Sequence, residues 1–164
     1  MTGSILQINV SPGGIPKTPV PEALLTPLGF EGDSVAHPKI HGGPRQAVLL
    51  ICSEAIKELK ALGYPLFAGA LGENLTTLGL DRRQMRPGQR YRVDEAVIEI
   101  TKLRRPCAAL DIYGPAIQRE IFDAAVKAGD SSSPRWGLSG FYAAVLRPGL
   151  IRRDAIISLI EEAV

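Results

Sequence analysis

The sequence predicts a mainly β domain, built as a barrel or a sandwich, with a few peripheral α-helices. Glycine (17 residues) and proline (13 residues) interrupt the chain at short intervals, and the segments between them are mostly apolar runs of strand length. A chain of 164 residues, of which 45% are hydrophobic and 22% charged, has the size and balance of one soluble globular unit. We therefore expect residues 1–164 to form a single domain.

The strands are expected wherever β-branched and other apolar residues cluster between turn signals. From Arg90 to Val93, charged and apolar residues alternate, which is typical of a strand with one buried face. Asp94 and Glu95 then turn the chain into the next strand as a hairpin. In order, the expected strands are Ser4 to Val10, Ala47 to Cys52, Asn74 to Leu78, Gln89 to Val93, Ala96 to Thr101, Leu138 to Leu146 and Ala155 to Ile160.

Two segments have helical spacing instead. The first has Ser53 as its N-cap and stops at Gly63, and the second opens with Pro115 in its first turn and ends at Gly129. In the second, apolar residues from Ile117 onward recur along one face. We expect both helices to cover a barrel.

Charge and hydropathy exclude several classes of protein. A net charge of +2 is too small for general nucleic-acid binding, and no apolar run reaches the roughly 20 residues that cross a bilayer. The N-terminal residues lack the features of a signal peptide, so no membrane is expected and the cytoplasm is the default location. Two cysteines cannot build a disulfide framework or an all-cysteine metal cluster, so each must be interpreted singly.

Cys107 follows two arginines and a proline, just beyond an expected strand. If a helical turn begins at Ala108, the sulfur lies near unpaired N–H groups and two cations, which favour the thiolate that binds soft metals or attacks sulfur. The alternative is a small buried hydrophobe without function. Cys52 closes the apolar run AVLLIC and is expected in the core.

The segment from His37 to Arg45 carries two histidines four residues apart, the spacing of metal ligands on a helix. Pro38 and the Gly42–Pro44 run predict a loop instead. In a loop, a spacing of four residues does not place both histidines on one side, so it does not indicate a metal site. The loop either presents His41, Lys39 and Arg45 to an anion or is merely a turn.

The glycine-rich stretch Gly69 to Gly79 lacks the lysine of a P-loop. Its Glu73 and Asn74 either hydrogen-bond a ligand or cap a strand. Near the C-terminus, an aromatic group forms either one wall of a pocket or part of the core. That group consists of Trp136, Phe141 and Tyr142 beside Gly137.

Six ordered blocks resemble the MOSC domain family, named for the C-terminal domain of molybdenum-cofactor sulfurases, and within it the small single-domain bacterial members. Their order and spacing make chance agreement improbable. The blocks are GGIPKTPV (Gly13 to Val20), GFEGD (Gly29 to Asp33), HGGPRQAV (His41 to Val48), GENLTTLGL (Gly72 to Leu80), RRPCAAL (Arg104 to Leu110) and GLSGFYAAVLRPG (Gly137 to Gly149).

The resemblance implies a β-barrel-like fold with peripheral helices and a site around the family cysteine, here Cys107. In the family this cysteine either ligates molybdenum or carries sulfur as a persulfide. Relatives that bind the molybdenum cofactor reduce N-hydroxylated compounds such as hydroxylaminopurines, hydroxylamines and amidoximes. The pyranopterin bears a phosphate and a dithiolene, so the resemblance gives the anion-binding loops a ligand, and it extends the site from Cys107 to further residues. These are Lys39, His41, Arg45, Glu73, Asn74 and Arg104.

The leading hypothesis is a molybdenum enzyme in which Cys107 ligates the metal and a separate reductase supplies electrons to reduce an N-hydroxylated small molecule. Pyridoxal phosphate is not expected. The alternatives are a sulfur carrier that uses a Cys107 persulfide and a non-catalytic cofactor-binding module. For the enzyme and for the cofactor-binding module, we expect a partly open, locally basic pocket. Cys107 lines this pocket, and the His41–Arg45 loop contributes to it. We expect Lys39, Arg45, Arg104 and Arg105 to supply its charge, with Arg135 as a fifth cation.

Overall fold

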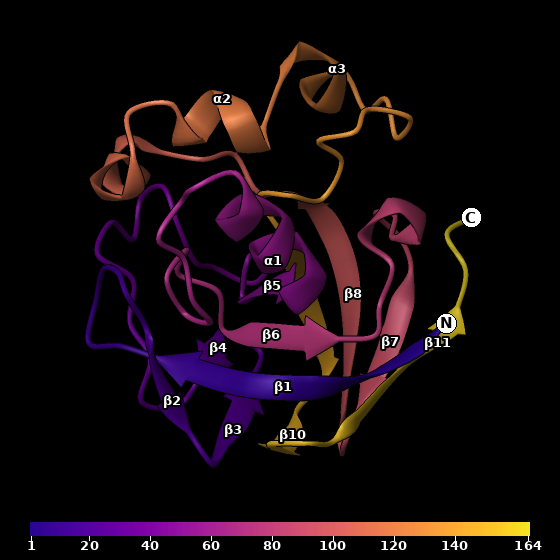
Figure 1. Cartoon of the computed structure of the whole chain (residues 1–164). Coiled ribbons are helices and arrows are strands. Elements are labelled where there is room, and N and C mark those ends of the chain that lie inside the picture. The colour runs from indigo at the N-terminus through magenta and orange to yellow at the C-terminus, as the bar shows by residue number, and fades with distance from the viewer.

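Seven strands close into a barrel (Figure 1), in a computed structural model that describes all residues from 1 to 164. A hydrogen-bonded contact between the last strand and the first completes the ring. The pair β5 and β6 is parallel, and the other neighbours are antiparallel. Around the ring the strands are β11 (Ile156–Glu161), β7 (Arg90–Val93), β8 (Ala96–Leu103), β9 (Phe141–Arg147), β5 (Val48–Cys52), β6 (Leu75–Leu78) and β1 (Thr2–Val10).

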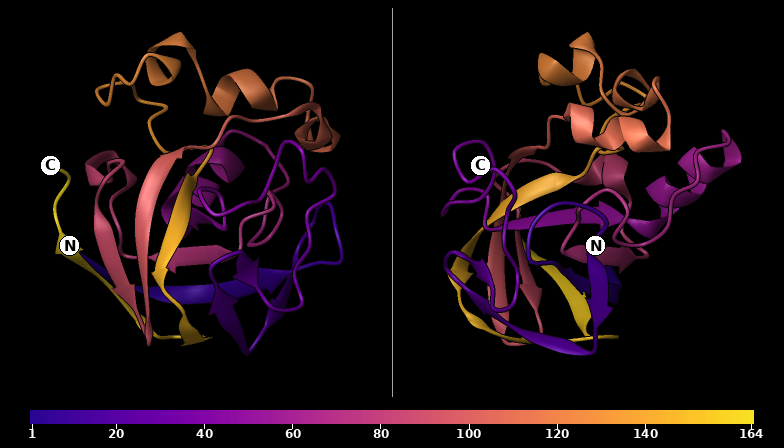
Figure 2. Two further views of the ribbon diagram at one scale, coloured as in Figure 1. Left: turned by 180° about the vertical axis from the view of Figure 1, so that it is seen from behind. Right: turned by 90° about the vertical axis from the view of Figure 1, so that its left-hand side faces the viewer.

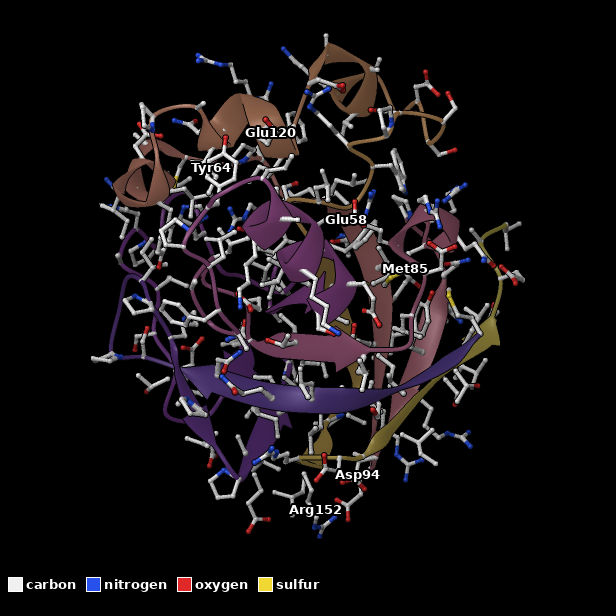
Figure 3. The ribbon with its side chains drawn as sticks, viewed as in Figure 1. Glu58, Tyr64, Met85, Asp94, Glu120 and Arg152 are labelled. Atoms are coloured by element: carbon white, nitrogen blue, oxygen red, sulfur yellow. The ribbon has the colours of Figure 1, made fainter.

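A small second sheet lies at the lower end of the barrel in Figure 1. It consists of β10 (Gly149–Arg152), β3 (Glu22–Thr26) and β4 (Gly29–Phe30), while β2 (Thr18–Val20) extends the main sheet beside β1. Leu25, Phe30 and Ile151 of this sheet are buried in the same core cluster as the barrel interior. The small sheet therefore closes this end of the barrel, where Asp94 and Arg152 form an ion pair at 3.2 Å (Figure 3).

Helical segments cover the opposite end and one side of the barrel (Figure 2). Apolar residues of α1 and α2 pack in a second core cluster that includes Ile51, on the outer face of β5. The two core clusters thus lie inside the barrel and between β5 and the helices. The segments are α1 (Ser53–Ala61), the 3₁₀ turns η1 (Arg82–Gln84) and η2 (Ala108–Tyr113), α2 (Ile117–Ile121) and α3 (Ala124–Lys127). None of the helices is both long and apolar enough to span a membrane.

The mainly β fold class is confirmed, and each expected strand is present to within a few residues. The hairpin is also confirmed, because Val93 pairs with Ala96 across a turn in which Asp94 has a φ of 52°. The strand expected from Leu138 begins only at Phe141, since Gly137 and Gly140 have φ values of 75° and 92° that interrupt extended backbone.

Two helix predictions were wrong in detail. Cys52 is the N-cap of α1, and Ser53 is its first helical residue. The helix expected from Pro115 to Gly129 is broken at Phe122, because the carboxylate of Asp123 accepts from the N–H of Val126 and starts α3. A side chain that caps a new helix competes with continuation of the old one.

Candidate functional site

A cavity of about 500 Å³ lies where the loops after β1, β4 and β8 meet. In Figure 1 these loops occupy the left side of the barrel, beside η2, and Figure 2 shows the same grouping from behind. Apolar side chains such as Leu28 and Phe30 form much of the wall. Its polar and charged side chains include Lys17, Asn74, Arg104, Cys107 and Tyr142.

Cys107 lies in the cavity wall at the point where β8 has ended and η2 begins. The backbone N–H of Arg104 still bonds to the carbonyl of Gly140 at 2.9 Å, which holds the chain to the start of β9. Cys107 is then the extended N-cap residue of η2, and its carbonyl accepts from the N–H of Leu110. The thiol is half-buried, in contrast to the thiol of Cys52 in the core, whose burial raises its pKa to about 12.

Arg104 places a buried positive charge in the same wall. The residue is only 5% exposed, its guanidinium donates to the carbonyl of Leu71, and it takes part in none of the ion pairs of the structure. Burial lowers the pKa of Arg104, while Tyr142, Cys107 and Glu73 oppose this shift. A buried cation without a carboxylate partner is unfavourable by itself, so the position is suited to receive an anion.

A second cation, Lys17, is neutralised. Its ammonium nitrogen lies 2.6 Å from Oδ1 of Asp33, which also accepts from the N–H of Ser11. The amide of Asn74 donates to the other oxygen of Asp33 at 2.9 Å. This network ties the loops after β1 and β4 to the segment before β6, and thereby shapes one side of the cavity.

His41 and Tyr142 form a hydrogen-bonded pair in the wall, with 3.1 Å between Nδ1 and the phenol oxygen. Burial, followed by the charges of Arg104 and His37, lowers the pKa of His41. Burial also raises the pKa of Tyr142. Of the aromatic residues near the C-terminus, Tyr142 thus lines the cavity, whereas Trp136 and Phe141 pack in the core.

The structure brings together His41, Asn74, Arg104 and Cys107, but not the remaining predicted residues. Lys39 and Arg45 are exposed and outside the cavity wall, and Arg45 approaches Glu99 at 4.0 Å. Glu73 is completely buried and does not line the cavity.

The predicted set of basic residues must also be corrected. Arg105 lines the cavity as expected, but Arg135 faces Glu120 and Asp123 on the helical side of the molecule. Lys17 and Asp33 were missed, although both fall within sequence blocks that carry the family resemblance. Their position in those blocks was the sequence feature that could have identified Lys17 and Asp33 as site residues.

The sequence model of the MOSC domain matches residues 37–158, about three quarters of the chain. The chain belongs to the MOSC domain family. Lys17 and Asp33 precede the matched segment, so part of the cavity wall is built by residues outside it. The MOSC family is associated with binding of the molybdenum cofactor.

Individual MOSC relatives agree with this membership. The chain is 34% identical over 149 residues to YflK of Bacillus subtilis and 32% identical over 143 residues to YiiM of Escherichia coli. These matches cover 90% and 85% of the chain but only 63% and 59% of the relatives, so the chain spans about three fifths of their length.

Solved structures show the same fold. The crystal structure of YiiM from Geobacillus stearothermophilus has a TM-score of 0.71 and 28% identity, and the match covers 97% of this chain and 75% of that one. YiiM from Escherichia coli also has a TM-score of 0.71, with 24% identity over 98% of this chain and 71% of that one. The MOSC barrel is therefore shared, while the likeness to the second structure concerns the fold alone.

Proposed function

We propose that this MOSC protein binds the molybdenum cofactor in the cavity and reduces N-hydroxylated compounds, such as hydroxylaminopurines and hydroxylamines, to amines. The observation that carries the proposal is the pairing, in one cavity, of the Cys107 thiol with the buried guanidinium of Arg104, which has no carboxylate partner. A thiol is a soft ligand suited to a transition metal, and a guanidinium is suited to a phosphate.

The residues present fit the cofactor in three respects. A volume of about 500 Å³ is in the usual range for sites that bind small molecules. Cys107 offers one sulfur ligand, and Arg104 offers a buried cation that forms no ion pair within the protein and can therefore pair with a bound anion. The apolar part of the wall suits a planar heterocycle.

The cofactor, when bound, supplies the two-electron redox chemistry. The protein's part is to hold and orient it: Cys107 through sulfur, and Arg104 through charge-assisted hydrogen bonds to phosphate. Asn74 keeps the Lys17–Asp33 pair in place and so preserves the shape of the wall.

The proposal also needs an electron donor, and we infer a separate reductase as partner. Within the chain, no cluster of three or more histidine, cysteine, aspartate or glutamate side chains is arranged to hold a metal.

A sulfur carrier is the second candidate function, and the half-buried Cys107 thiol in an open cavity favours it. The same thiol would then hold a persulfide. A module that binds the cofactor without turnover is the third.

One preparation separates the three functions. The protein is made in a host that synthesises the cofactor. It is then analysed for molybdenum, for pterin fluorescence and for the mass of the peptide that contains Cys107. Stoichiometric molybdenum and pterin, with reductase-coupled turnover of an N-hydroxylated base, is the result expected for the enzyme. Cofactor without turnover indicates the binding module, and a Cys107 persulfide without molybdenum indicates the carrier.

A further inference from the structure

Glu73 stands between two cavity residues in the sequence but does not face the cavity. Its neighbours Gly72 and Asn74 line the wall, whereas the side chain of Glu73 is completely buried behind it. Direct contact with a ligand in the cavity is therefore not the role of this carboxyl group.

The carboxyl group instead fixes the turn that precedes it. One of its oxygens, Oε1, accepts from the N–H of Gly69 at 2.7 Å and from the hydroxyl of Thr76 at 2.9 Å. The carbonyl of Gly69 in turn accepts from the N–H of Lys17 at 2.9 Å. This approach is so close that a Cβ at Gly69 would lie 2.2 Å from the Lys17 carbonyl oxygen. The turn is thus clamped between β6 and the segment that carries Lys17.

The same turn holds Arg104. The guanidinium of Arg104 donates to the carbonyl of Leu71, two residues after Gly69. Arg104 forms no ion pair that would orient the guanidinium differently. The position of the Leu71 carbonyl therefore determines where this buried charge points.

We propose that Glu73 is a positioning residue for the cationic subsite of the cavity: it holds the Gly69–Leu71 turn, and through the Leu71 carbonyl it orients the guanidinium of Arg104. The ligand that Arg104 then binds rests on the proposed function, but the orientation of Arg104 does not.

The remaining oxygen of Glu73 has no hydrogen-bond partner, although it is fully buried. Such a group needs a compensating interaction, and the charge of Arg104 supplies an attractive one. Burial raises the pKa of Glu73, and the hydrogen bonds together with Arg104 oppose the shift. Because Oε1 accepts in the ionised and in the neutral acid alike, the positioning role does not depend on titration.

Two variants separate hydrogen bonding from packing. Glu73→Gln keeps an oxygen acceptor and removes the charge, whereas Glu73→Met keeps the volume and removes the acceptor. The measurement is the rate at which phenylglyoxal modifies Arg104 in the protein without cofactor, followed by peptide mass mapping. Arg82, a buried arginine held by Glu58 and the carbonyl of Pro134, serves as an internal control for general loosening.

We expect Glu73→Met to raise the modification rate of Arg104 about tenfold, the factor that corresponds to one lost hydrogen bond, with Arg82 unchanged. Glu73→Gln should behave as the parent. If Glu73→Met does not fold, Glu73→Asp, whose shorter side chain cannot span Gly69 and Thr76, replaces it with the same expectation. A folded Glu73→Met or Glu73→Asp variant with parental Arg104 reactivity, or equal rises at Arg104 and Arg82, would overturn the proposal.

A parallel arm with inorganic phosphate tests the anion subsite independently. Phosphate should protect Arg104 from modification in the parent and in Glu73→Gln. If phosphate gives no protection in the parent while Glu73→Met still exposes Arg104, the anion-binding part of the proposed function fails and the positioning role stands.

Discussion

Nδ1 of His41 lies 3.1 Å from the hydroxyl of Tyr142, and this contact joins residues 101 positions apart in the cavity wall. Burial, then Arg104 and His37, lowers the pKa of His41 from 6.5. The lowered pKa favours the neutral imidazole, whose Nδ1 can accept from the phenol in the tautomer that carries its proton on Nε2. The contact closes the loop after β4 against β9.

Stability should consequently depend on pH through His41. Since its pKa is lower in the folded than in the unfolded protein, the unfolded protein binds more protons between the two values. This contribution to the free energy of unfolding is fully present above pH 6.5 and is lost as the pH falls toward the folded pKa. Urea unfolding at a series of pH values measures the slope, which His41→Gln should flatten. An unchanged slope in that variant would mean that other groups cause the dependence.

Arg104 and Arg45 offer a matched pair of substitutions. Arg104→Gln should weaken retention of a phosphate-bearing cofactor by about 1.5–3 kcal/mol, the usual value of a hydrogen bond to a charged group. Arg45→Gln should leave it unchanged, because the Arg45 side chain is 70% exposed and outside the cavity wall. Pterin content after dialysis gives the comparison. Equal loss in both variants, or in neither, would contradict this assignment of the anion site.

Removing the charge of Asp33 should destabilise the loops around the cavity. Asp33→Asn leaves the buried ammonium of Lys17 without its counter-ion, a change that costs about 3 kcal/mol in comparable buried pairs. Urea unfolding measures the loss. Adding Lys17→Met should restore part of the stability, since the stranded charge is then gone, and a double variant no more stable than Asp33→Asn would contradict this explanation.

The barrel strands were predictable because their apolar residues either form a continuous run or alternate with polar residues between turn signals. The missed strands β2, β3, β4 and β10 have at most one buried residue each, so their sequences lack the apolar pattern of the barrel strands. The break between α2 and α3 was missed for a different reason: the apolar pattern continues through Phe122, and only the cap supplied by Asp123 stops the helix.

The candidate site was predictable where backbone context constrained a residue. Cys107 lies just beyond the end of β8 at Leu103, so its place near Arg104 could be inferred from local sequence. Lys39 and Arg45 were placed in the pocket on charge alone, but the charge of a loop residue does not determine which way it points. The pairing of Lys17 with Asp33 depends on the folding of two loops and leaves no local pattern.

The central claim, that Cys107 is the metal ligand, is tested most directly by molybdenum content in Cys107→Ser beside Cys52→Ser. Cys107→Ser replaces a soft sulfur in the cavity with a hydroxyl, so we expect a folded protein that lacks molybdenum. Cys52→Ser puts a hydroxyl into the core and should lose about 1–3 kcal/mol of stability while its folded fraction keeps the metal. Parental molybdenum content in Cys107→Ser, or a loss of stability as its only defect, would contradict the claim.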